Sequence, residues 1–131
     1  MSDQGNPITI VCIEDEPTMI DLVKLILAGP KYEVVGAMGG QEGIRKVEEL
    51  KPSLVLLDLM MPDMSGWDVY QQMKAIPELE HIPVVVVTAK AGNIDKVLGL
   101  HVAKVQAYIT KPFSPSELTA VVERVLAGEV D

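Results

Sequence analysis

Acidic side chains follow two of the apolar runs in this sequence, and their placement could support chemistry. Asp58 comes directly after the apolar run 54–57. Glu14 and Asp15 come directly after the apolar run 8–13. Runs of this kind are typical of strands buried on both faces of a parallel sheet, and such sheets bind ligands at the carboxyl ends of their strands. Asp58 is therefore the first candidate for a reacting group.

Two further apolar runs end in polar side chains of a different kind. The run 84–87 is followed by Thr88, and the run 107–109 leads through Thr110 to Lys111. Because the carboxyl ends of parallel strands meet at one edge of a sheet, we expect these groups to converge with the acids. Three carboxylates in one crevice raise one another's pKa unless a cation is present.

The side-chain types predict which cation this is and what it would assist. Oxygen ligands without a His or Cys cluster suit a hard ion, and Mg²⁺ typically takes one or two carboxylates, water and a phosphate oxygen. A lysine ammonium and a threonine hydroxyl are suited to the charge that develops on a transferring phosphoryl group. The predicted chemistry is phosphoryl transfer to Asp58, with its carboxylate as the nucleophile.

The elements that must position these groups alternate between strands and helices. The predicted strands cover residues 8–13, 34–37, 54–57, 84–87 and 107–109. The predicted helices cover residues 17–28, 41–50, 67–75, 93–102 and 115–127. Ser114 and Glu117 form a capping box at the start of the last helix, with proline at its first position. This alternation predicts an α/β fold: a five-stranded doubly wound parallel sheet with five helices.

Length and charge limit the classes of protein that the chain can belong to. Its 131 residues, 48% of them hydrophobic, are enough for one core. A net charge of -8 repels a phosphate backbone, so we expect no direct nucleic-acid partner. No apolar stretch approaches the ~20 residues of a membrane span, and no secretory signal is evident, so we expect a cytoplasmic protein without a membrane partner. The one cysteine, Cys12, is predicted to be a buried apolar side chain.

Four motifs together resemble a known family. They are residues 11–17 (VCIEDEP), 54–66 (LVLLDLMMPDMSG), 87–89 (VTA) and 108–113 (YITKPF). In this order, at these strand ends, they closely resemble the CheY-like receiver domains of two-component response regulators, which have a flavodoxin-like fold. The resemblance covers residues 8–127, and we expect residues 1–7 to be a flexible N-terminus and residues 128–131 a C-terminal tail.

The resemblance implies a role for each acid. Asp58 would accept a phosphoryl group from a phosphohistidine on a sensor histidine kinase or a histidine phosphotransfer protein. Asp15, Asp58 and the backbone carbonyl of Met60 would bind Mg²⁺ directly. Glu14, at a position where aspartate is more usual, would act through a metal-bound water.

The resemblance also implies how phosphorylation would be sensed. Lys111 would pair with Asp58 and then with the phosphoryl group. Thr88 would move to donate a hydrogen bond to that group, and Tyr108 would turn inward behind it. The bond between Lys111 and Pro112 would be cis, which an X-Pro bond permits at modest cost. Such a domain is a signalling switch and catalyses only its own phosphorylation and dephosphorylation.

In this family the output surface is formed by the fourth helix, the fifth strand and the fifth helix. Between residues 81 and 113 the chain has one acid and several lysines, which are Lys90, Lys96, Lys104 and Lys111. This pattern predicts a basic surface that docks an acidic partner protein. Lysines that are simply solvated explain the pattern equally well.

Three alternatives remain open at this point. The chain could be a stand-alone receiver or a piece of a larger regulator or hybrid kinase. It could be a pseudo-receiver, an interaction module that is never phosphorylated, but the presence of all five expected site residues argues against this. An aspartate-nucleophile phosphohydrolase of the haloacid dehalogenase type is disfavoured, because that group needs Asp-x-Asp after its first strand and residues 14–17 read Glu-Asp-Glu-Pro.

Overall fold

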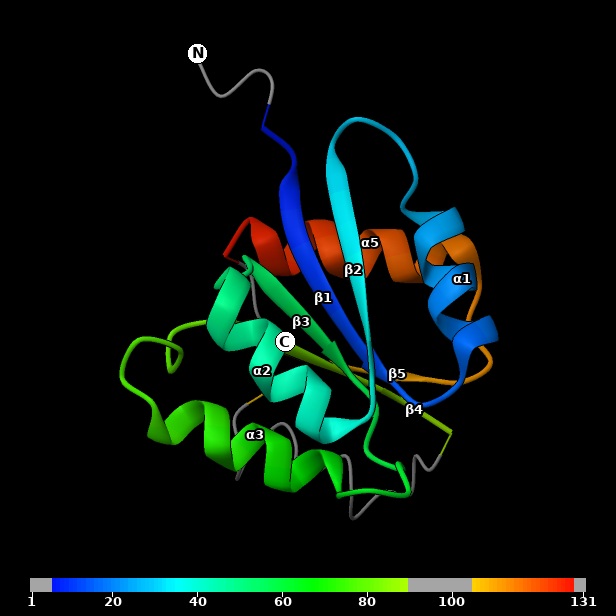
Figure 1. Cartoon of the computed structure of the whole chain (residues 1–131). Coiled ribbons are helices and arrows are strands. Elements are labelled where there is room, and N and C mark those ends of the chain that lie inside the picture. The colour runs from blue at the N-terminus through cyan, green and yellow to red at the C-terminus, as the bar shows by residue number, and fades with distance from the viewer. Residues whose placement is uncertain (1–5, 90–104, 129–131) are drawn as a thin grey trace.

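The computed structural model describes residues 6–89 and 105–128, and it places five parallel strands in one sheet (Figure 1). The strands are β1 (Ile8–Glu14), β2 (Tyr32–Met38), β3 (Leu54–Leu57), β4 (Val84–Thr88) and β5 (Ala107–Thr110). Their spatial order is β2-β1-β3-β4-β5. The direction of winding changes between β1 and β3, and a doubly wound sheet has its ligand crevice at this point. The predicted doubly wound sheet is confirmed.

Helices cover both faces of the sheet. Those in the described residues are α1 (Pro17–Ile26), α2 (Gly40–Leu50), α3 (Gly66–Ala75) and α5 (Pro115–Leu126). The first and last of them lie on one face, and α2 and α3 lie on the other (Figure 1). The helix predicted over 93–102 lies outside the described residues. No helix in the described ranges is both long enough and apolar enough to span a membrane.

The strand side chains alternate between two separate cores. Val11 and Ile13 of β1 pack under α2 and α3, whereas Ile10 and Cys12 pack under α1 and α5. The same alternation in β3 leaves every side chain of Leu54–Leu57 buried. The continuous apolar runs of the sequence therefore mark strands covered on both sides. Cys12 is buried as predicted, and burial is the main reason why its pKa rises to about 12.

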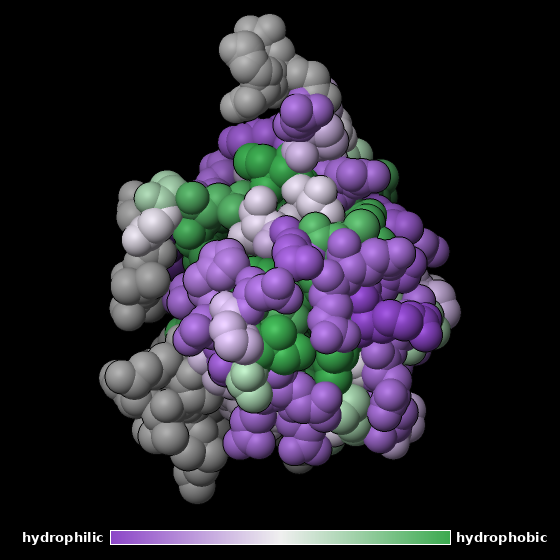
Figure 2. Space-filling model, turned by 60° about the vertical axis from the view of Figure 1, so that its left-hand side comes forward, coloured by the Kyte–Doolittle hydropathy of each residue, from purple (hydrophilic) through white to green (hydrophobic). Residues whose placement is uncertain are grey.

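The surface retains a few large apolar side chains. Those that are exposed among the described residues are Leu22, Leu25, Met38, Leu50 and Met60. Leu22 of α1 and Leu50 of α2 are each 39% exposed. In Figure 2, hydrophilic side chains cover most of the visible face, and apolar areas lie between them.

Local sequence explains how α2 and α5 begin and pack. The hydroxyl of Ser114 accepts a hydrogen bond from the backbone N–H of Glu117, as predicted for the start of α5. Gly43 lies within α2 because the helix crosses β1 closely there. A Cβ atom at Gly43 would lie 2.7 Å from side-chain atoms of Ile13. Packing against β1 therefore requires a glycine at this position of the helix.

Candidate functional site

The pairing of β1 with β3 brings two acids together. Glu14 is the last residue of β1, and Asp58 directly follows β3. The strands are in register at Ile13 and Leu57, and the backbone N–H of Asp58 donates a hydrogen bond of 3.1 Å to the carbonyl of Ile13. The sheet therefore fixes the backbone of both acids at the crevice between these strands.

Three of the predicted site residues form one acidic cluster. Glu14, Asp15 and Asp58 each offer a carboxylate oxygen, and these atoms lie within 4.8 Å of one another. Glu14 is 2% exposed and Asp58 is 6% exposed, whereas Asp15 is half-buried. Like charges this close and this poorly solvated are unfavourable without a cation.

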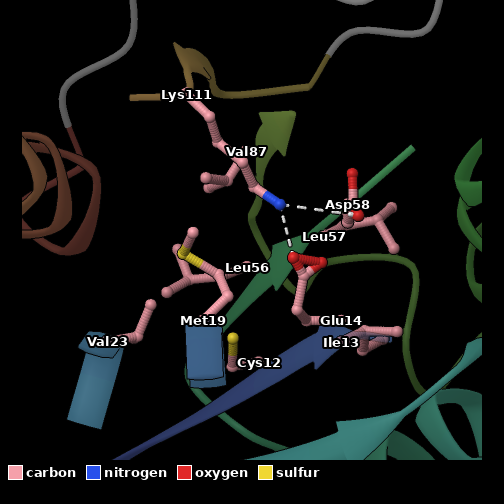
Figure 3. A pocket seen from close by; sticks show the side chains of 10 residues that line it. All are labelled: Cys12, Ile13, Glu14, Met19, Val23, Leu56, Leu57, Asp58, Val87 and Lys111. Atoms are coloured by element: carbon pink, nitrogen blue, oxygen red, sulfur yellow. Dashed lines mark hydrogen bonds and ion pairs between the residues drawn. The ribbon is translucent and has the colours of Figure 1, made fainter. Parts of the chain in front are cut away.

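Lys111 supplies one cation from the loop that follows β5. Its Nζ donates a hydrogen bond to Glu14 and lies 3.6 Å from Oδ2 of Asp58 (Figure 3). The side chain of Lys111 is 13% exposed. Its backbone N–H donates to the carbonyl of Thr88, and the bond from Lys111 to Pro112 is cis, as the family resemblance implies.

Burial and charge shift the pKa of two of these groups. Burial, followed by the nearby carboxyl of Asp58, raises the pKa of Glu14 to about 8, although Lys111 opposes the shift. Burial lowers the pKa of Lys111, but its hydrogen bond to Glu14 and the surrounding negative charges outweigh burial and raise the pKa overall. The ammonium group therefore stays charged, and Glu14 holds a proton far more readily than a solvated glutamate.

One oxygen in the cluster has no hydrogen-bond partner. Within residues 6–89 and 105–128, Oε1 of Glu14 is buried and accepts no hydrogen bond. An unpaired buried acceptor beside two other carboxylates suits a cation that binds oxygen. The donor set is made of carboxylates and fits a hard divalent ion such as Mg²⁺.

A small cavity lies next to the cluster, between α1 and the carboxyl ends of the central strands (Figure 3). Its polar lining residues are Glu14, Asp58 and Lys111. The others are Cys12, Ile13, Met19, Val23, Leu56, Leu57 and Val87. The cluster therefore has an apolar side, which keeps the effective dielectric low around its charges.

The remaining predicted site residues lie around this centre. Met60 has an exposed side chain, and its backbone N–H donates a hydrogen bond of 3.2 Å to Oδ1 of Asp58. Thr88 is fully buried at the end of β4. Tyr108 in β5 is half-buried and packs against the core beneath α2 and α3. The cavity lining includes neither Thr88 nor Tyr108.

The predicted basic surface was assigned four lysines. Lys90, Lys96 and Lys104 lie outside the described residues. Lys111 was counted with them but is wrongly placed there, because its ammonium group points into the acidic cluster (Figure 3).

One functional candidate was missed by sequence reasoning. Asp63 lies in the loop between β3 and α3. Its carboxylate accepts hydrogen bonds from the backbone N–H groups of Gly40 and Gln41, at 3.0 and 3.1 Å. No local sequence motif predicts this contact, because the partners are more than 20 positions apart.

Known proteins resemble this chain in sequence. The family model of the response regulator receiver domain matches residues 10–123. DNA-binding response regulator MtrA of Mycolicibacterium smegmatis is 36% identical over 122 residues, which are 93% of this chain and 52% of that protein. The alkaline phosphatase synthesis transcriptional regulatory protein PhoP of Bacillus subtilis is 37% identical over 117 residues, covering 89% of this chain and 48% of that protein. The chain thus spans about half the length of these relatives.

These relatives correct one prediction. We expected no direct nucleic-acid partner, but MtrA is named as a DNA-binding protein, so the prediction is wrong for this group of proteins. It rested on the net charge of -8. The charge of a segment that covers half of such a protein does not determine what the other half binds.

A solved structure agrees with the sequence comparisons. The response regulator receiver domain protein (CheY-like) from Methanospirillum hungatei JF-1 superimposes with a TM-score of 0.83 at 30% identity, covering 94% of this chain and 96% of that one. The fold, the acidic cluster between β1 and β3, and the family match all indicate the same family. The chain belongs to the response regulator receiver domain family of two-component signal transduction.

Proposed function

We propose that this domain is a switch controlled by phosphorylation of Asp58. The supporting observation is that Asp58 lies within 4.8 Å of two further carboxylates and 3.6 Å from the ammonium group of Lys111. A phosphoryl group arriving there would meet both a candidate metal site and a fixed cation. The donor would be a phosphohistidine on a sensor histidine kinase or a histidine phosphotransfer protein.

Asp15, Asp58 and the backbone carbonyl of Met60 would hold Mg²⁺, and Glu14 would contact it through water. The bound ion supplies positive charge that offsets repulsion between the carboxylates and the incoming phosphoryl group. The unpaired buried oxygen of Glu14 supports this assignment. Residues 8–127 would form the complete receiver unit.

The transfer itself exchanges one bond to phosphorus for another. A carboxylate oxygen of Asp58 forms the new P–O bond as the P–N bond to histidine breaks, and the histidine nitrogen keeps the electron pair. Lys111 would pair first with the Asp58 carboxylate and then with the phosphoryl oxygens. Thr88 would then donate its hydroxyl hydrogen bond, and Tyr108 would turn inward behind it.

The output would be a change in protein contacts rather than turnover of a small substrate. The domain would catalyse only its own phosphorylation and dephosphorylation. The name of MtrA favours a DNA-binding output for the whole protein, which the receiver would control.

Intact mass spectrometry tests the phosphoacceptor directly. The wild type and Asp58→Asn are incubated with Mg²⁺ and acetyl phosphate, with a magnesium-free sample alongside. Asp68→Asn is a matched control, because it makes the same chemical change at an exposed position on α3. We expect one Mg²⁺-dependent phosphoryl adduct in the wild type and in Asp68→Asn, and none in Asp58→Asn. An adduct that persists in Asp58→Asn contradicts the assignment, and no adduct with acetyl phosphate or a phosphohistidine donor indicates a pseudo-receiver.

A further inference from the structure

The N-terminus of α2 has no side-chain cap of its own. Its N-cap residue is Gly39, with φ 99° and ψ 170°, a conformation that L side chains rarely adopt. The first N–H groups of a helix need acceptors from outside the helix. Here Asp63 supplies them from the loop after β3, with Oδ1 accepting from Gly40 and Oδ2 from Gln41. These bonds are the main reason why the pKa of Asp63 is lowered.

The packing around this cap leaves no space between α2 and the loop. A Cβ atom at Gly39 would lie 3.1 Å from Oδ1 of Asp63. A Cβ atom at Gly40 would lie 2.2 Å from the side chain of Met64. The two glycines therefore permit a close contact between elements that are far apart in the sequence.

The same loop carries the phosphoacceptor. It begins at Asp58, whose Oδ1 accepts a hydrogen bond from the backbone N–H of Met60. It closes where the N–H of Gly66 donates 3.0 Å to the carbonyl of Leu59, and a Cβ atom at Gly66 would lie 2.3 Å from the carbonyl oxygen of Asp58. Both ends of the loop are thus fixed at the acidic cluster, and Asp63 fixes its middle to α2.

We propose that Asp63 is a positioning residue: by capping α2 from the loop, it holds the backbone of Met60 and the carboxylate of Asp58 in the geometry that binds the metal. The inference rests on the proposed function, because it assigns a role in that same site. It also implies a reciprocal effect. If α2 stabilises the loop conformation that binds metal, then metal binding must stabilise the cap on α2 to the same extent.

Two variants and one control test the inference. Asp63→Ala removes both acceptors, and Asp63→Asn keeps one carbonyl oxygen. Glu78→Ala removes a charge from an exposed position outside the loop that carries Asp63. Calorimetry gives the Mg²⁺ Kd of each protein. Amide NMR gives the exchange rates of the Gly40 and Gln41 N–H groups with and without Mg²⁺.

Loss of a helix cap lowers the population of the loop conformation that binds metal by a modest factor. We therefore expect Mg²⁺ to bind about 2- to 5-fold more weakly to Asp63→Ala than to the wild type, and Asp63→Asn to have an affinity between these two. Glu78→Ala should bind like the wild type. In the wild type Mg²⁺ should slow amide exchange at Gly40 and Gln41, and in Asp63→Ala this slowing should disappear.

Separate outcomes overturn the inference and the proposed function. A wild-type Kd in both Asp63 variants, with faster exchange at Gly40, would mean that Asp63 caps α2 without positioning the site. A wild type that does not bind Mg²⁺ at all would refute the proposed metal site, and this inference with it. If Asp63→Ala is unfolded in urea titration, Asp63→Asn alone decides, and an unchanged Kd in it counts against the inference.

Discussion

The ammonium group of Lys111 donates a hydrogen bond to the buried carboxylate of Glu14, although the family resemblance implies that it pairs with Asp58. Its distance to Oδ2 of Asp58 is 3.6 Å. One lysine is therefore shared by two acids. Because Glu14 has a longer side chain than the aspartate more usual at this position, it reaches the lysine from the end of β1. Lys111 thus compensates the charge of the acidic cluster.

Replacing Lys111 with methionine should show this first role. Lys111→Met keeps an unbranched side chain but leaves two buried carboxyl groups without their cation. We expect the free energy of unfolding without metal to fall by about 1–3 kcal/mol, the cost of leaving a buried polar group without its partner. Mg²⁺ should restore part of the loss. Urea unfolding at pH 8, with and without Mg²⁺, measures both effects.

The matched control for this change is Lys24→Met, an exposed lysine of α1. It should alter the free energy of unfolding by less than about 0.5 kcal/mol. Equal losses in the two variants would show that the position of Lys111 in the cluster has no special importance for stability.

The raised pKa of Glu14 predicts a pH dependence. Its pKa is about 8 in the folded protein against an ordinary value of 4.5. Between these values the folded state holds a proton that the unfolded state has released. Without metal, the free energy of unfolding should therefore decrease as the pH rises from 4.5 to about 8. A carboxylate must lose its proton to take part in a metal site, so Mg²⁺ affinity should increase over the upper part of the same range.

Urea unfolding and calorimetry across this pH range check both trends. The control is Glu14→Gln, which cannot titrate but has nearly the same shape. In Glu14→Gln, the free energy of unfolding should decrease less as the pH rises, and the corresponding rise in Mg²⁺ affinity should be absent. Profiles that are identical in Glu14→Gln and the wild type would assign the pH dependence to another group.

Gly43→Ala should destabilise the protein even though alanine is the better helix former. The new Cβ atom would lie 2.7 Å from two side-chain atoms of Ile13, which is buried in the core. Overpacking of this kind typically costs about 1–3 kcal/mol, more than the ~1 kcal/mol gained in helix propensity. Thermal or urea unfolding measures the net change. Glu49→Ala, at an exposed position of the same helix, should not destabilise the protein, and a stabilised Gly43→Ala would show that α2 can move away from β1.

Lys74→Met should weaken the connection between α3 and β4. The Nζ of Lys74 donates to the backbone carbonyls of Glu80 and Ile82, at 2.7 and 2.9 Å. Burial lowers its pKa, which indicates a poorly solvated position. We expect a loss of about 1–3 kcal/mol in the free energy of unfolding, because two carbonyls lose a charged donor. This connection is at the opposite ends of the strands from the acidic cluster, so the Mg²⁺ Kd should not change, and a weaker Kd would reveal coupling across the sheet.

The sequence predicted the sheet and the acids through patterns that need no long-range information. Apolar runs such as Leu54–Leu57 can only be buried on both faces, and this places Asp58 at a strand end. The cap of α5 is also local, since Ser114 and Glu117 are three residues apart. In contrast, helical periodicity identifies an apolar face but not how far the neighbouring elements cover it, and Leu22 and Leu50 are each 39% exposed.

What the sequence determined by itself was therefore the order of the elements, the chemistry of the strand ends and the family. Only the tertiary structure decided which partners these groups have. Lys111 is 97 positions from Glu14, and Asp63 is 23 positions from Gly40. Such contacts depend on strand order, register and the close approach that Gly39 and Gly40 permit. Local sequence sets backbone preference and burial, whereas the pairing of charges depends on distances that exist only after the chain has folded.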